Sequence, residues 1–134
     1  MQLPDNVRAF LLEPRFAVLA TTKRDGTPQQ SVVWYDVDGD TILMNTAVGR
    51  DKNNNLLRDE RASLCVPDGY RYVTLEGTVT TNDDQATAQA GIRRLAIRYT
   101  GEETGNKQAD EVYSKQQRVT ICLKVENVIT YQLQ

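Results

Sequence analysis

The stretch that predicts the fold most clearly is RFAVLATTKRDGTPQQSVVWYDVDGDTILMNT, which spans residues 15–46. Three runs within it are rich in β-branched and aromatic residues, at 15–22, 28–36 and 41–46. Asp25-Gly26 and Asp38-Gly39 separate these runs, and Asp-Gly pairs are strong hairpin signals because glycine reaches the backbone angles of a tight turn. The stretch therefore predicts three consecutive antiparallel strands.

The pattern continues on both sides of this stretch. Upstream, apolar residues at helical spacing predict a short amphipathic helix over residues 4–12. Downstream, residues 51–59 predict a second short helix with Leu56 and Leu57 facing inward. The other predicted strands are apolar runs bounded by turn residues, at 61–66, 70–80, 119–125 and, after a turn at Glu126-Asn127, 128–133.

Longer helical patterns occur only late in the chain. Asn82-Asp83-Asp84 predicts the cap of a helix that runs to about Tyr99, and a polar helical stretch at 107–117 follows a break at 101–105. Six or seven strands in hairpin order, with late helices, predict an antiparallel barrel with accessory helices that is mainly β in class. The length of 134 residues predicts a single domain over residues 1–134.

Composition argues against several classes of function. Lys and Arg number 16 against 18 Asp and Glu, whereas a nucleic-acid binder normally has a basic excess. No apolar run approaches the roughly 20 residues of a membrane span, and the charged first residues do not resemble a secretory signal, so we expect a cytoplasmic protein. Histidine is absent, and Cys65 and Cys122 stand alone in apolar runs, so we expect two core thiols and no metal site.

The segment with the clearest chemistry is MNTAVGRDKNNNL, residues 44–56, where a predicted strand gives way to a helix. Arg50 and Lys52 stand at the helix start. The unpaired amides and the dipole of a helix N-terminus favour anions, so two cations there are unfavourable unless a bound anion completes the site. A phosphate would satisfy both side chains and the free amides. The alternative is a solvated turn in which Arg50 pairs with Asp51 or Glu60.

Taken in order, several stretches resemble the pyridoxamine 5′-phosphate oxidase-like superfamily of flavin- and deazaflavin-binding split β-barrels. They are FAVLAT and DGTP within 16–28, SVVWY at 31–35, RDK and NL within 50–56, and YRYVTLEG at 70–77. The resemblance covers roughly residues 5–133 and implies an antiparallel split β-barrel that forms a homodimer, with two cofactor sites at the interface. The compact size, with no histidine and no Arg-x-His element, is more similar to the flavin/deazaflavin oxidoreductases that use coenzyme F(420), an 8-hydroxy-5-deazaflavin, than to authentic pyridoxamine phosphate oxidases.

The resemblance also implies roles for individual residues. The phosphate of the cofactor would be held by Arg50 and Lys52, with further hydrogen bonds from Asn55 and Thr46. The residues implied to lie near the tricyclic ring or the opening of the neighbouring subunit are Ser31, Val33, Trp34, Tyr70 and Tyr72. Plainer interpretations stay open, namely a solvated Asn55, a Thr46 satisfied by the backbone, a core Trp34, and cross-strand packing of Tyr70 and Tyr72.

The implied activity is hydride transfer from reduced deazaflavin to an unsaturated organic acceptor. The cofactor carries this chemistry, and the protein mainly orients two rings. A proton would come from solvent or from a tyrosine such as Tyr35 or Tyr72. Two alternatives remain open: an FMN-dependent oxidase or flavin reductase on the same scaffold, and a carrier protein that binds the cofactor without turnover.

Overall fold

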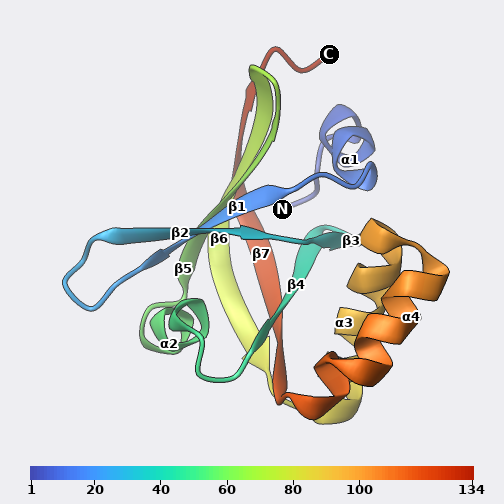
Figure 1. The fold of residues 1–134 in the computed structure, drawn as a ribbon. Coiled ribbons are helices and arrows are strands. Elements are labelled where there is room, and N and C mark those ends of the chain that lie inside the picture. Colours follow the sequence, from blue (N-terminus) through green and yellow to red (C-terminus); the bar gives the residue numbers. More distant parts are fainter.

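One antiparallel sheet of seven strands forms the body of the molecule, in the order β2-β1-β5-β6-β7-β4-β3 (Figure 1). The computed structural model describes residues 1–134. In chain order the strands are β1 (Ala17–Thr22), β2 (Pro28–Val33), β3 (Asp36–Asp38), β4 (Thr41–Ala47), β5 (Arg61–Asp68), β6 (Arg71–Asn82) and β7 (Arg118–Tyr131). The helices are α1 (Asp5–Leu12), α2 (Asp51–Arg58), α3 (Gln85–Thr100), α4 (Glu102–Glu111) and the 3-10 turn η1 (Tyr113–Lys115).

The sheet curls because its two edge strands are consecutive in the chain. Strands β2 and β3 stand at opposite edges, yet only Trp34 and Tyr35 separate them. So short a link forces the two edges toward each other, and no strand pairing closes the gap between β2 and β4. The prediction of a mainly β, antiparallel split barrel with accessory helices is confirmed.

Helix α3 is fixed across the open side of the barrel. It packs against β4, β7 and α4 (Figure 1). Near its end, the Tyr99 hydroxyl donates to the Arg15 carbonyl at 2.7 Å, and Arg98 Nε donates to the Tyr35 carbonyl at 3.0 Å. The helix is therefore attached to the link that joins the two edges of the sheet. None of the helices has the combination of length and apolar character that crossing a membrane requires.

Strand and helix boundaries differ from the predictions at several places. The helical stretch predicted at 107–117, for example, is divided between α4, which ends at Glu111, and η1. The predicted strand at 28–36 ends at Val33, because the chain turns toward the other edge of the sheet. The predicted turn at Glu126-Asn127 is a bulge inside the continuous strand β7, where Glu76 pairs with Asn127 but Gly77 pairs with Val125. The predicted break at 101–105 is limited to Gly101, whose φ of 93° ends α3 before α4 begins.

Three side chains face differently from the predictions. Leu57 is 68% exposed, and the face of α2 that points inward carries Asn53 and Asn55 beside the buried Leu56. Cys65 and Cys122 were expected in the core, but both are half-buried. Each alternates along its strand with fully buried residues, so each thiol belongs to the outward side of the sheet.

Candidate functional site

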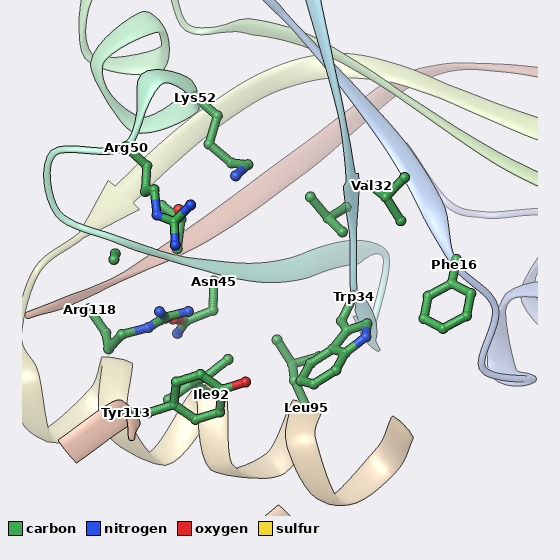
Figure 2. A pocket seen from close by; sticks show the side chains of 13 residues that line it. Phe16, Val32, Trp34, Asn45, Arg50, Lys52, Ile92, Leu95, Tyr113 and Arg118 are labelled. Atoms are coloured by element: carbon green, nitrogen blue, oxygen red, sulfur yellow. Dashed lines mark hydrogen bonds between the residues drawn. The ribbon is translucent and has the colours of Figure 1, made fainter. Parts of the chain in front are cut away.

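A pocket of about 300 Å³ lies at the split of the barrel, between the edge strand β2, strand β4 and helix α3 (Figure 2). It has a cationic end and an apolar end. The residues that line it are Phe16, Val32, Val33, Trp34, Asn45, Thr46, Ala47, Arg50, Lys52, Ile92, Leu95, Tyr113 and Arg118. Absence of pairing between β2 and β4 leaves this space open, so the topology itself creates the pocket.

Two of the cations are placed by the corner between β4 and α2. Strand β4 ends at Ala47, and Gly49, with a φ of 90°, turns the chain in a conformation that favours glycine. Helix α2 then begins at Asp51, and no side chain caps its first amides. Arg50 and Lys52 extend from this start into the pocket (Figure 2).

A third cation, Arg118, enters from the first residue of β7. It is only 7% exposed. Its Nε donates to Oδ1 of Asn45 at 2.9 Å, and its Nη1 donates to Oε1 of Gln116 at 2.7 Å. The guanidinium also lies 5.0 Å from the ring centroid of Tyr113. Because every partner is neutral, the side chain is held in place with its charge intact.

The positive charges at this corner are not balanced by paired carboxylates. No carboxylate forms an ion pair with Arg50, Lys52 or Arg118. The pKa of Lys52 lies below its ordinary value because burial disfavours the charged amine, and because both arginines repel it. Burial likewise lowers the pKa of Arg118, and Arg50 adds to the effect. A bound anion would relieve this repulsion and satisfy the free donors.

The other end of the pocket is a wall of aromatic rings. Trp34 stacks on Tyr99 with ring centroids 5.2 Å apart and planes 10° apart, and Phe16 stacks on the same Tyr99 at 5.9 Å. Tyr99 is held from behind, since its hydroxyl donates to the Arg15 carbonyl. The wall is therefore rigid. Ile92 and Leu95 of α3 provide an apolar floor between this wall and Arg118 (Figure 2).

The structure brings together five of the nine residues that the sequence indicated for cofactor binding. The residues in the pocket are Arg50, Lys52, Thr46, Val33 and Trp34. The residues outside its lining are Asn55, Ser31, Tyr70 and Tyr72, together with the suggested proton donor Tyr35. Thr46 is buried at the strand end, directly before the corner that carries the cations.

The residues outside the lining have other environments, and Ser31 pairs with Leu19 of β1 in the sheet. The Asn55 amide donates to Thr21 Oγ1 of β1 at 3.1 Å and to Gln29 Oε1 of β2 at 2.9 Å, so it is bonded to the sheet and does not line the pocket. Tyr70 is 89% exposed at the turn between β5 and β6, and Tyr72 stacks on Tyr131 at 5.7 Å.

Tyr35 is fully buried in the link between the sheet edges. Its hydroxyl donates to the carbonyls of Leu11 and Glu13, 3.0 and 3.1 Å away. Burial raises the pKa of Tyr35 to about 12. The Tyr35 hydroxyl therefore attaches the end of α1 to the barrel. The tyrosine that lines the pocket is Tyr113.

Sequence reasoning missed the α3 side of the pocket. Arg118, Asn45 and Tyr113 come from three separate segments, and none forms a local motif with the others. One signal was available for Arg118. It directly precedes the alternating strand that begins at Val119, and a cation next to a buried strand requires a partner.

The fold and the pocket together define a split β-barrel with a cationic corner and an aromatic wall at its split. The chain belongs to the pyridoxamine 5′-phosphate oxidase family, whose family model matches residues 3–132. Among characterised relatives, it is 33% identical over 100 residues to an F(420)H(2)-dependent biliverdin reductase of Mycobacterium tuberculosis. That alignment covers 73% of each of the two chains.

Solved structures agree with this assignment. A conserved hypothetical protein of Mycobacterium tuberculosis superposes with a TM-score of 0.80 at 26% identity, covering 96% of this chain and 84% of the other. An F(420) reductase superposes with a TM-score of 0.77, also at 26% identity, covering 95% of this chain and 98% of the other. Each superposition covers nearly the whole of this chain.

Proposed function

We propose that this protein is an oxidoreductase that uses coenzyme F(420) and transfers hydride from the reduced coenzyme to an unsaturated organic acceptor. The observation that carries the proposal is the pocket of three cations without a carboxylate, joined to an apolar, aromatic wall. The named activities of the Mycobacterium tuberculosis relative and of the solved F(420) reductase favour the deazaflavin coenzyme over FMN.

The residues of the pocket fit such a coenzyme. At the corner, Arg50, Lys52 and the uncapped start of α2 offer only donors, and a phosphate offers only acceptors. Beyond the corner, Val33 and Trp34 provide an apolar surface for a flat ring. Most ligand pockets combine an apolar lining with a few convergent polar groups in this way.

The protein contributes binding and orientation. Arg50 and Lys52 anchor the phosphate, while the stacked Trp34 and Tyr99 limit how far a ring can tilt. When bound, the reduced deazaflavin supplies the hydride, and one double bond of the acceptor is reduced as a proton is taken from solvent. Holding two reactants in this fixed geometry removes much of the entropic barrier to their reaction.

A homodimer is part of this proposal. Across the outward side of the sheet, strand pairing aligns one row of side chains: Val32, Val18, Cys65, Thr74 and Ile129. Val32 at one end of the row is 68% exposed and also lines the pocket. At about 300 Å³ the pocket has the smallest volume expected of a ligand site, roughly 300–1,000 Å³. A second copy seated on this row would enlarge and close it.

The proposal is tested by cofactor titration and by turnover. Purified protein is titrated with F(420) and, separately, with FMN, and bound species are identified by mass. Oxidation of reduced F(420) is then followed with tetrapyrroles, quinones and enones, beginning with biliverdin because of the relative's activity. Tight F(420) binding with turnover supports the proposal. Preference for FMN would favour an oxidase or flavin reductase, and tight binding without any turnover would favour a carrier.

A further inference from the structure

The charges in the pocket exceed those of a single phosphate. Three cations line it, and none has a carboxylate partner. A phosphate group brings about two negative charges at most near neutral pH. Arg50 is exposed and Lys52 is half-buried, whereas Arg118 is buried, so Arg118 is the cation that solvent compensates least when the phosphate corner is filled. Burying a charge without a partner costs free energy. A second bound anion would remove this cost.

Arg118 comes from a different element than the other two cations, although it is close enough to repel both. Arg50 and Lys52 belong to the corner before α2, whereas Arg118 begins β7 and lies on the α3 side of strand β4 (Figure 2). Its backbone is clamped by one side chain of α3. The Arg118 amide donates to Oε1 of Gln85 at 3.0 Å, and Nε2 of Gln85 donates to the Arg118 carbonyl at 2.9 Å.

The guanidinium keeps donors free for a ligand. An arginine has five N–H donors, and within the protein Asn45 and Gln116 accept from two of them. The guanidinium carbon lies 5.0 Å from the centroid of the Tyr113 ring, and the hydrogen bonds to Asn45 and Gln116 restrain the orientation of the group. A planar group with fixed orientation and unused donors matches a carboxylate, which accepts two parallel hydrogen bonds from arginine.

We propose that Arg118 is a second anion subsite that binds a carboxylate of the acceptor, so that the acceptor is an unsaturated organic acid. This inference rests on the proposed function. The apolar floor of Ile92 and Leu95 leads from the aromatic wall to Arg118 (Figure 2). A conjugated acceptor lying on this floor would carry its acid group to the guanidinium. Arg118 lies inside the pocket and is only 7% exposed. A carboxylate on a part of the coenzyme that extends out of the pocket would therefore be in solvent and would not contact this arginine.

The test compares an acid with its ester. Biliverdin and biliverdin dimethyl ester share one conjugated system, but only the first carries carboxylates. Trp34 is the single tryptophan and lines the pocket, so quenching of its fluorescence reports binding, with equilibrium dialysis as a check. Measured without coenzyme, wild-type protein should bind the acid at least roughly tenfold more tightly than the ester. In Arg118→Gln this preference should fall below about threefold, and Arg118→Lys should restore part of it.

A matched variant separates the two anion sites. Arg50→Gln combined with Lys52→Gln should weaken F(420) binding while the preference for acid over ester persists. If Arg118→Gln does not fold, Gln116→Leu removes one support of the guanidinium and should reduce the preference without abolishing it.

Three results would overturn the assignment. They are equal binding of acid and ester by the wild type, an unchanged preference in the folded Arg118 variant, and loss of F(420) affinity in Arg118→Gln with the preference intact. The last would make Arg118 a ligand of the coenzyme. Failure of the proposed function is a separate result: the wild type would bind no F(420) and reduce no acceptor, while the preference for the acid stayed measurable.

Discussion

Asn45 connects Arg118 to helix α3: its Oδ1 accepts from Arg118 Nε at 2.9 Å, and its Nδ2 donates to the Ala88 carbonyl at 2.9 Å. The amide thus fixes the guanidinium without neutralising it. Asn45→Asp keeps the shape but adds a charge that pairs with Arg118. We expect at least a roughly tenfold loss of affinity for biliverdin, and a smaller loss in Asn45→Leu. Equal losses, measured by fluorescence titration, would show that the neutrality of this partner is unimportant.

The corner before α2 should control the affinity for the coenzyme. Replacing Arg50 and Lys52 together by Ala removes two charge-assisted contacts, each worth about 1.5–3 kcal/mol, so F(420) should bind at least tenfold more weakly. Arg58→Ala is the matched control on the same helix. Arg58 faces away from the pocket and donates to the Thr22 carbonyl, so its loss should change affinity less than about twofold. Unchanged affinity in the double variant would eliminate the phosphate assignment.

Affinity for the coenzyme should decrease at alkaline pH. The pKa of Lys52 is lowered by burial and by the two neighbouring arginines, so this amine loses its proton below the ordinary lysine value of 10.5. A bound phosphate stabilises the charged amine and raises its pKa. Binding is therefore strongest while Lys52 is protonated and weakens as pH rises through the pKa of the free protein. Titrations of the wild type and Lys52→Arg check this, because the arginine variant should show no such decrease.

The local part of this site could be predicted from the sequence, and the long-range part could not. Arg50 and Lys52 are recognisable because a strand end, a glycine and a helix start stand next to them in the chain. Arg118 has no such neighbours. Its partners Asn45 and Gln85 lie 73 and 33 residues away, and only the pairing of β4 with β7 and the packing of α3 bring them together.

The fold shows the same division. The hairpins follow from Asp-Gly turns and alternating strands, which are local signals. The inward face of α2 was misjudged because Asn55 is buried through hydrogen bonds to Thr21 and Gln29, and a hydropathy pattern does not show such partners. Hydropathy also placed Leu57 inside, but one turn of helix cannot present both Leu56 and Leu57 to the same core.

Tyr35 should affect stability and leave hydride transfer unaffected. Its hydroxyl donates to the carbonyls of Leu11 and Glu13, and Tyr35→Phe removes this donor from both, although Arg98 Nη2 still donates to the Leu11 carbonyl at 3.1 Å. We expect a loss of about 1–3 kcal/mol in the free energy of unfolding, seen in urea titration. Turnover well below the unfolding midpoint should match the wild type, since Tyr35 lies outside the pocket lining. A large drop in turnover with unchanged stability would restore Tyr35 as a proton donor.

The bulge between β6 and β7 depends on Gly77. A Cβ on this residue would stand 1.9 Å from the Lys124 carbonyl oxygen and 3.3 Å from the Glu126 amide, so backbone would have to move. We expect Gly77→Ala to destabilise the fold by about 3 kcal/mol or more, beyond most overpacked cores. Gly91→Ala is the control, because its Cβ meets nothing closer than 3.4 Å and alanine favours the helix α3 by up to about 1 kcal/mol. The two variants should shift the urea midpoint in opposite directions; a Gly77→Ala midpoint equal to the wild type would mean that the strands pair without this bulge.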